Sequence, residues 1–169
     1  MQKSKISLRE LIVYSMLGTI MFLSDLLMEA LPNIHALAMF IALFTLLFRA
    51  RALIPIYVYV MLTGVYAGLA LWWVPYLYIW AILWAALMLI PKKLSDKWKF
   101  IISIILCALH GLFFGILYAP MQALMYGLSF KAMLTWILAG TAFDIVHMFG
   151  NLAMSFLIIP LYKTMKKLI

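Results

Sequence analysis

Three polar side chains stand on one stripe of the last hydrophobic segment of the sequence. Asp144, His147 and Asn151 follow one another at spacings of three and four residues, which places them on one face of an α-helix. A carboxylate, an imidazole and a carboxamide are costly to expose to lipid, so these groups must face protein or water. We consider two interpretations: a ligand-contacting surface, or an internal polar network that holds helices together.

A second polar group surrounds the end of the first hydrophobic segment. Asp25 and Glu29 are one helical turn apart, and Asn33 and His35 follow in a loop. This patch could attract a cationic or hydrogen-bond-donating solute, so Glu29, Asn33 and His35 are candidate binding residues. Solvation of a helix end at the membrane interface is the alternative explanation for the two carboxylates.

Aromatic residues gather between the third and fourth hydrophobic segments. Trp72 and Trp73 precede a proline, and Tyr76, Tyr78 and Trp80 follow it. Aromatic belts at the membrane interface account for such clusters without a ligand, and we assign Tyr78 and Trp80 to a belt. The rings of Trp72, Trp73 and Tyr76 could instead stack on a planar solute or cap a pocket, so these three residues join the candidate site.

The middle of the fifth segment holds His110, directly before a Gly111-x-x-x-Gly115 pattern. Small residues at this spacing let helices approach closely, and His110 is either a buried hydrogen-bonding residue or a pocket residue. The single cysteine, Cys107, excludes a disulfide within the chain and is expected to be a buried thiol. Because no Cys/His or Met-x-x-Met spacing indicates a metal site, we expect no metal or other cofactor.

Mostly apolar elements must position all of these residues. Of the 169 residues, 69% are apolar and 11% are charged, a composition that a water-soluble domain of this size cannot place on its surface. A helix crosses the hydrocarbon layer in about 20 residues, so the sequence predicts an all-α integral membrane protein with a single six-helix transmembrane domain over residues 1–169. The predicted spans lie near residues 10 to 31, 34 to 48, 53 to 71, 74 to 90, 100 to 119 and 132 to 161.

Basic residues are distributed unevenly between the predicted loops. Twelve of the thirteen Lys and Arg residues fall in the two termini and in the second and fourth loops, and Lys131 is the exception. Because cytoplasmic loops of membrane proteins are enriched in Lys and Arg, both termini are predicted to face the cytoplasm. The same distribution accounts for the net charge of +8 without a nucleic-acid partner.

Several enzymatic and transport classes lack their motifs in this sequence. It contains no G-x-x-x-x-G-K-[ST], H-E-x-x-H or G-x-S-x-G pattern, so neither ATP hydrolysis by a P-loop nor the corresponding hydrolase mechanisms are expected. No inverted repeat of the kind found in many secondary transporters is visible. We therefore expect a protein that is not an enzyme, and any active transport would need energy from another subunit.

Taken in order, these features resemble the substrate-binding S components of energy-coupling factor (ECF) vitamin and micronutrient importers, which are ABC-type transporters. The resemblance covers nearly the whole chain and rests on size, six spans, the loop Leu31-Pro-Asn-Ile-His35 and the segment Phe143-Asp-Ile-Val-His-Met-Phe-Gly-Asn151. It implies a multi-pass protein of a bacterial or archaeal cytoplasmic membrane, with a solute pocket near the outer face. It also implies that the chain docks on a membrane scaffold component, and that two ATPase subunits bound to this scaffold power the transport.

In that family an Ala-x-x-x-Ala-like pattern on the first helix contacts the scaffold. The matching place in this sequence contains Ser15, Gly18 and Thr19, which supply small side chains without the alanines. The resemblance therefore implies a docking surface at these three residues. No residue set specific to one vitamin is present, so the identity of the solute stays open.

We expect the chain to capture a small organic micronutrient with a planar or heterocyclic part. The expected binding residues are Glu29, Asn33, His35, Trp72, Trp73, Tyr76, His110, Asp144, His147 and Asn151. Two other functions stay open from the residues alone. Asp144 and His147 could serve an intramembrane enzyme as acid and base, or with Glu29 as metal ligands, and the chain could instead be a ligand-free membrane assembly factor.

Overall fold

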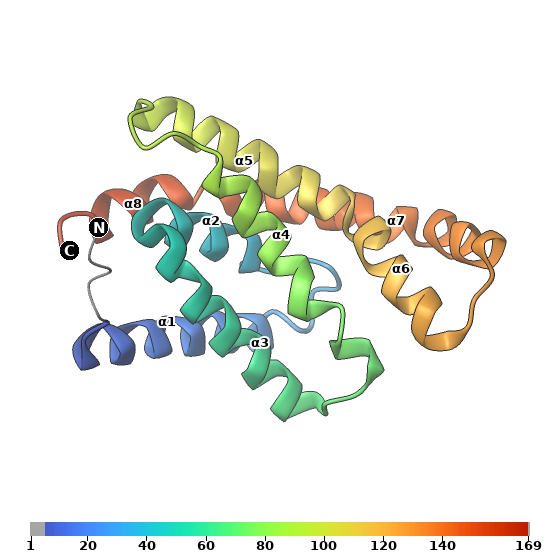
Figure 1. Cartoon of the computed structure of the whole chain (residues 1–169). Helices are drawn as coiled ribbons and strands as arrows, with labels where there is room; N and C mark the ends of the chain where they lie inside the picture. Colours follow the sequence, from blue (N-terminus) through green and yellow to red (C-terminus); the bar gives the residue numbers. More distant parts are fainter. Residues whose placement is uncertain (1–5, 169) are drawn as a thin grey trace.

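The computed structural model describes residues 6–168, and this range contains helices and loops but no strand. The predicted all-α class is confirmed. The helices are α1 (Leu8–Leu27), α2 (Leu37–Phe48), the 3-10 turn η1 (Arg49–Ala52), α3 (Leu53–Ala67), the 3-10 turn η2 (Leu71–Trp73), α4 (Tyr76–Met88), α5 (Asp96–Leu112), α6 (Phe114–Tyr126), α7 (Phe130–Ser155) and α8 (Ile158–Met165) (Figure 1).

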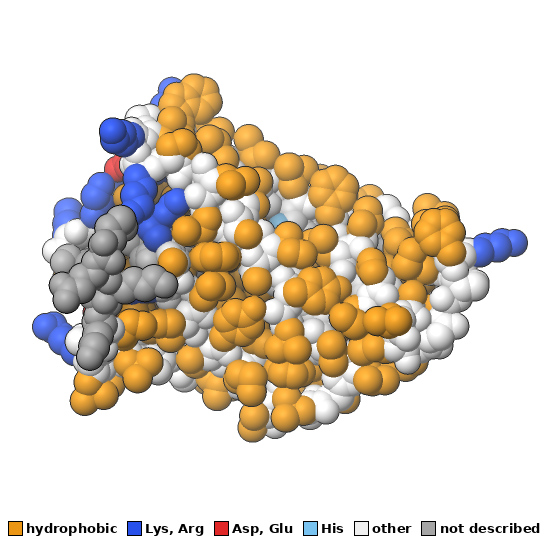
Figure 2. Space-filling view, viewed as in Figure 1, with side chains coloured by type: hydrophobic (Ala, Val, Ile, Leu, Met, Phe, Trp, Pro, Cys, Tyr) orange, Lys and Arg blue, Asp and Glu red, His pale blue; other side chains and the backbone are white. Residues whose placement is uncertain are grey.

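Four stretches of helix are long and apolar enough to cross a membrane. They are Leu8–Leu27, Leu37–Ala67, Leu71–Met88 and Phe130–Met165. A fifth arises if α5 and α6, which are bent by 41° relative to each other, form one broken span. Leu8 and Leu124 are about three-quarters exposed, and large apolar side chains cover most of the face shown in Figure 2. This surface suits lipid, as expected for a multi-pass membrane protein.

The chain reverses direction between α2 and α3, although both belong to one long apolar stretch. Phe48 at the end of α2 packs against Tyr14 near the start of α1, with ring centroids 5.1 Å apart. Tyr66 at the end of α3 packs instead against Phe22 near the end of α1, at 5.5 Å. Therefore α2 runs toward the beginning of α1 and α3 runs away from it, with the turn made at η1 (Figure 1).

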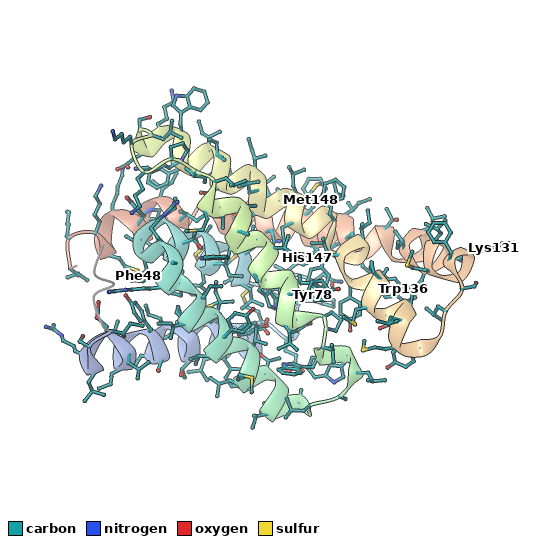
Figure 3. The ribbon with its side chains drawn as sticks, in the orientation of Figure 1. Phe48, Tyr78, Lys131, Trp136, His147 and Met148 are labelled. Atoms are coloured by element: carbon teal, nitrogen blue, oxygen red, sulfur yellow. The ribbon has the colours of Figure 1, made fainter. Side chains whose placement is uncertain are left out.

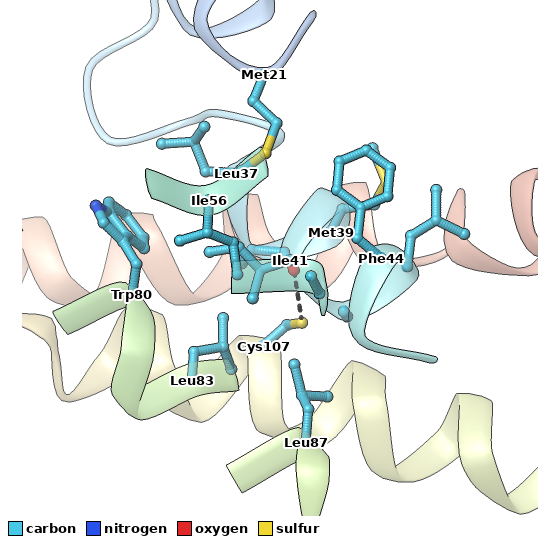
Figure 4. Packing of buried hydrophobic residues seen from close by; sticks show 14 of the residues in the cluster. Met21, Leu37, Met39, Ile41, Phe44, Ile56, Trp80, Leu83, Leu87 and Cys107 are labelled. Carbon is cyan, nitrogen blue, oxygen red and sulfur yellow. Dashed lines mark hydrogen bonds between the residues drawn. The ribbon is translucent and has the colours of Figure 1, made fainter. Parts of the chain in front are cut away.

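The core is built around α2. This helix is buried along most of its length and contacts α4, α5, α7 and α8. Figure 4 shows Ile41 of α2 packed near Leu83 of α4 and Cys107 of α5. The Cys107 thiol is buried, as predicted, and donates a hydrogen bond to the carbonyl oxygen of Ala38, 3.3 Å away. With 12 residues, α2 is about 18 Å long at ~1.5 Å per residue, shorter than the hydrocarbon layer.

Charge is segregated to one end of the molecule. Figure 2 shows Lys and Arg side chains gathered at the end where the two termini lie in Figure 1, and Figure 3 shows Lys131 at the opposite end. At the basic end, α1 begins with a reciprocal capping box formed by Ser7 and Glu10. At the opposite end, α7 begins after Ser129, whose hydroxyl accepts a hydrogen bond from the amide of Ala132 at 3.2 Å.

The helix boundaries differ from the predicted spans in several places. The sequence predicts a loop from Ala119 to Lys131, and this is wrong because α6 continues through Pro120 to Tyr126. Proline removes a single backbone donor, a cost that the surrounding helix tolerates at this position. The helix then stops at Gly127, which has a left-handed φ of 64°. The first span is shorter than predicted, since α1 ends at Leu27 and leaves a loop over residues 28–36.

The small residues of α1 do not all face outward. Gly18 is buried, and a Cβ added there would lie 2.6 Å from Cβ of Val58 and 2.7 Å from the carbonyl oxygen of Pro55. The glycine is therefore required for close packing of α1 on α3. Thr19 is exposed and Ser15 is half-buried. Only these two of the three implied docking residues therefore lie on the surface of α1 that faces away from the rest of the protein.

Replacing Gly18 with leucine is expected to lower the free energy of unfolding by about 1 to 3 kcal/mol, because the new side chain overpacks the α1–α3 contact. Thermal unfolding of the purified protein in detergent measures the change. Thr19→Leu adds the same kind of side chain to an exposed position and is expected to leave stability nearly unchanged. Equal destabilisation by both substitutions would contradict the packing role of Gly18.

Candidate functional site

The three histidines of the chain come together with aromatic rings in the interior. His35 comes from the loop before α2, His110 from α5 and His147 from α7. The ring centroids of His35 and His147 are 4.7 Å apart, and the ring of Trp80 on α4 lies 5.5 Å from that of His110. We call His35, Tyr76, Trp80, His110, Phe114 and His147 the histidine–aromatic cluster.

Trp80 and Phe114 connect the histidines. The ring centroid of Phe114 lies 4.9 Å from that of His147, 6.0 Å from that of His110 and 5.7 Å from that of Trp80. Trp80 also lies 6.0 Å from His35. The assignment of Trp80 to an interfacial belt is wrong, because only 1% of this residue is exposed. Figure 3 shows His147 between the basic end, marked by Phe48, and the opposite end, marked by Lys131.

Several nitrogen atoms in the histidine–aromatic cluster are buried without a hydrogen-bond partner in the described part of the chain. They are Nδ1 of His35, Nδ1 of His110, Nε2 of His147 and Nε1 of Trp80. Most buried polar atoms in proteins are paired, and an unpaired one costs about 1 to 3 kcal/mol. Four such atoms from four different elements therefore mark a site that a polar molecule would stabilise.

The hydrogen bonds that do form define the chemistry of one of these atoms. Nε2 of His110 lies 3.2 Å from the carbonyl oxygen of Ile79, which can only accept a hydrogen bond. In neutral His110 the proton is therefore on Nε2, and the unpaired Nδ1 is an acceptor. The indole N–H of Trp80 can only donate. The cluster thus presents at least one acceptor and one donor that lack partners.

A glycine that the sequence did not single out brings His35 into the cluster. The backbone of the loop over residues 28–36 passes directly over Gly150 of α7, because a Cβ at this position would lie 3.2 Å from the carbonyl oxygen of Asn33 and 3.3 Å from Cα of Ile34. Asn33 has a φ of 59°, a left-handed conformation that asparagine adopts more readily than most residues. Gly150 and Asn33 therefore fix the loop, and Asn33 serves as a positioning residue.

The three residues of the polar stripe on α7 have two different roles. Asp144 and Asn151 bond to neighbouring helices, and His147 belongs to the histidine–aromatic cluster. The carboxylate of Asp144 accepts a hydrogen bond of 3.1 Å from the amide of Gly115, at the start of α6. The carboxamide of Asn151 donates a 3.1 Å bond to the carbonyl oxygen of Cys107 on α5. Both residues hold α7 to its neighbours, and only His147 between them contacts the aromatic rings.

The break between α5 and α6 depends on the same contacts. A Cβ at Gly115 would lie 2.5 Å from Oδ2 of Asp144, and one at Gly111 would lie 2.9 Å from Nδ2 of Asn151. The predicted close-packing role of this glycine pair is confirmed. The carboxylate of Asp144 is placed where the first amides of α6 need an acceptor, so it acts as a cap supplied by another helix.

The predicted aromatic group also separates into two roles. Tyr76 links Trp72 to Trp80, with ring centroids 5.7 Å apart on each side. Trp73 lies elsewhere: its indole nitrogen donates a 2.7 Å hydrogen bond to the carbonyl oxygen of Val60, which holds η2 against α3. Trp72 is therefore adjacent to the histidine–aromatic cluster, whereas Trp73 packs outside it.

The acidic residues of α1 and the following loop lie at the edge of this arrangement. Asp25 accepts a 3.0 Å hydrogen bond from the hydroxyl of Tyr59, whose ring lies 6.1 Å from that of Trp80. Glu29 is exposed. Within residues 6–168, no group of three or more His, Cys, Asp or Glu side chains is arranged to hold a metal ion.

The chain has no match among protein-family models, curated proteins or solved structures. Its function is therefore inferred from the geometry of the histidine–aromatic cluster and from the distribution of charge.

Proposed function

We propose that this protein is a membrane-embedded binding subunit that captures a small planar solute at the histidine–aromatic cluster for import. The unpaired nitrogen atoms of His35, His110, His147 and Trp80 carry this proposal. A solute with hydrogen-bonding edges would pair them, and the surrounding rings offer faces on which a planar group can stack. The resemblance to ECF S components, which rests on size, six predicted spans and two segments that include His35 and His147, points to the same function.

The cluster favours a particular kind of solute. It supplies the donor of Trp80 and the acceptor of His110, and none of its six residues is Lys, Arg, Asp or Glu. A ligand that carries both a donor and an acceptor on one neutral planar group satisfies these partners. A heterocycle or an aromatic amide fits this description better than a phosphate or a free carboxylate does.

Entry of the solute requires the loop over residues 28–36 to move. The surface grooves of about 960, 500, 370 and 350 Å³ are lined by other residues, and Trp80, His110 and His147 of the cluster are buried. His35 enters the cluster on this loop, and the loop meets α7 through its contact with Gly150. Separation of the loop from α7 would expose His147 and return His35 to solvent.

The proposal includes six membrane crossings, with both termini in the cytoplasm. The crossings would be α1, α2 with its preceding loop, α3, α4, the α5–α6 pair and the α7–α8 pair. The reversal at η1 supports counting α2 and α3 separately, and the gathering of basic residues at the terminal end supports the orientation. An irregular loop within the membrane is tolerated when protein surrounds it. The loop that carries His35 meets this condition, because it packs on α7 at Gly150 and His35 itself contacts His147 and Trp80.

The surface of α1 that faces away from the rest of the protein is the proposed docking surface for a membrane scaffold component with two ATPase subunits. Ser15 and Thr19 line a groove of about 500 Å³ together with apolar neighbours such as Met16. Small side chains at this spacing allow close approach of another helix. This surface lies apart from the cluster, so a partner could bind while the solute is held.

Purification from the protein's own host in mild detergent tests this function. Mass spectrometry of the purified sample is expected to find a planar small molecule in nearly equimolar amount, together with scaffold and ATPase subunits. A preparation that is folded and monodisperse but contains neither a small molecule nor partner subunits would overturn the proposal.

A further inference from the structure

A groove at the basic end of the molecule has no role in capturing a solute at the histidine–aromatic cluster. Its volume is about 960 Å³, and the start of α1, the junction of α2 with η1 and the end of α8 enclose it. Four basic side chains line it: Arg9, Arg49, Arg51 and Lys92. Glu10 is the single acidic residue in the lining, and it forms an ion pair with Arg51.

Acidic partners are scarce at this end of the chain. Apart from Glu10, the acidic residues are Asp25 and Glu29 at the far end of α1, Asp144 in the middle of α7, and Asp96, which pairs with Lys99 and Lys166. Among the described residues no carboxylate contacts Arg9, Arg49 or Lys92 within 4.0 Å. Within residues 6–168, the groove therefore concentrates positive charge that Glu10 offsets only at Arg51.

Arg49 is held in an unusual way at the inner wall. Its guanidinium donates hydrogen bonds of 3.2 and 2.6 Å to the carbonyl oxygens of Ile90 and Met88, while its buried Nε has no partner in the described chain. Its φ of 55° is a left-handed conformation that costs a non-glycine residue about 1 kcal/mol or more. The two hydrogen bonds of the guanidinium offset part of this cost and fix the Arg49 side chain at the wall of the groove.

The walls below the charged mouth are apolar. Leu47, Phe48 and Met165 line the same groove, and Val13 and Leu17 of α1 extend it toward the middle of the molecule. A soluble phosphate compound would gain from the basic residues alone. A phospholipid would gain from both parts, because its acyl chains can follow the apolar wall of α1 into the membrane.

We propose that this groove binds the headgroup of an anionic phospholipid, with its phosphate between Arg9, Arg49 and Lys92. Basic pockets between helices at the membrane surface are suited to such headgroups, and each basic residue near the surface strengthens attraction to anionic lipid by roughly fivefold. The inference is independent of the proposed solute function, because the groove and the histidine–aromatic cluster share no residue.

The test compares two double variants that remove the same charge from the same end. Arg9→Gln with Lys92→Gln changes two exposed residues of the groove, whereas Lys93→Gln with Lys97→Gln changes two exposed residues outside it. Arg49 is left in place because it holds the end of α4. Native mass spectrometry of delipidated protein titrated with phosphatidylglycerol or phosphatidylcholine measures lipid binding.

Phosphatidylglycerol is expected to bind the unmodified protein in preference to phosphatidylcholine. The groove variant is expected to bind phosphatidylglycerol about thirtyfold more weakly, and the control variant within about threefold of the original affinity. Equal weakening in both variants, or equal binding of the two lipids, would overturn the proposal. Displacement of the lipid by glycerol phosphate at similar concentrations would overturn it as well, because the site would then take a soluble phosphate compound.

Discussion

Replacing Trp80 with alanine is expected to lower the free energy of unfolding by about 3 to 5 kcal/mol, the largest stability effect of a single truncation that we predict. Only 1% of Trp80 is exposed, and its ring lies between those of His35, His110 and Phe114. Truncation removes the contacts that connect α4 with the loop before α2 and with α5. Reversible unfolding in mixed micelles measures the change.

Trp98→Ala provides the matched control. This tryptophan lies in the first turn of α5 and is 54% exposed, so its truncation is expected to change stability by about 0.5 kcal/mol or less. If the two alanine variants unfolded at the same denaturant concentration, Trp80 would not be the centre of the packing described above.

Replacing His147 with alanine is expected to weaken solute binding by roughly ten- to a hundredfold. The substitution removes one of the unpaired nitrogens from the cluster, and a lost buried hydrogen bond costs about 1 to 3 kcal/mol. Titration of the purified protein with its solute measures the affinity, and circular dichroism establishes that the helices are retained.

Asp144→Ala is the control that separates an effect on solute binding from an effect on stability. Asp144 lies one turn before His147 on α7. Because Asp144 caps α6 through Gly115, its loss is expected to lower the unfolding temperature while the solute affinity stays within about threefold. If the His147→Ala protein bound solute normally and only unfolded at a lower temperature, the prediction would be contradicted. His147 would then hold helices together, as Asp144 does.

The sequence reveals the helices and the histidines for the same physical reason. Apolar runs are needed to cross a membrane, so a polar side chain within one is conspicuous. His110 and His147 were found in this way, and His35 was found in the loop between two such runs. The stripe on α7 was also visible, but periodicity gives only a shared face and does not distinguish a cap such as Asp144 from a cluster residue such as His147.

Residues whose role depends on a neighbour could not be assigned from the sequence. The sequence predicts Trp80 as an interfacial residue because buried and interfacial tryptophans occur in similar contexts along a chain. Gly18 shows the same limit, since a small residue on α1 permits close packing by any helix, and the helix that approaches is α3 of the chain itself. Gly150 becomes informative only once the loop is seen to cross it.

The central claim is that a solute pairs the buried ring nitrogens of the histidine–aromatic cluster. The chain has only three histidines, so ¹⁵N magnetic resonance of protein labelled at histidine resolves each ring in detergent or lipid. On addition of saturating solute, we predict that the Nδ1 resonances of His35 and His110 and the Nε2 resonance of His147 shift from values of unpaired nitrogens to those of hydrogen-bonded ones. Solute that binds tightly while all three histidines keep their original resonances would contradict the account.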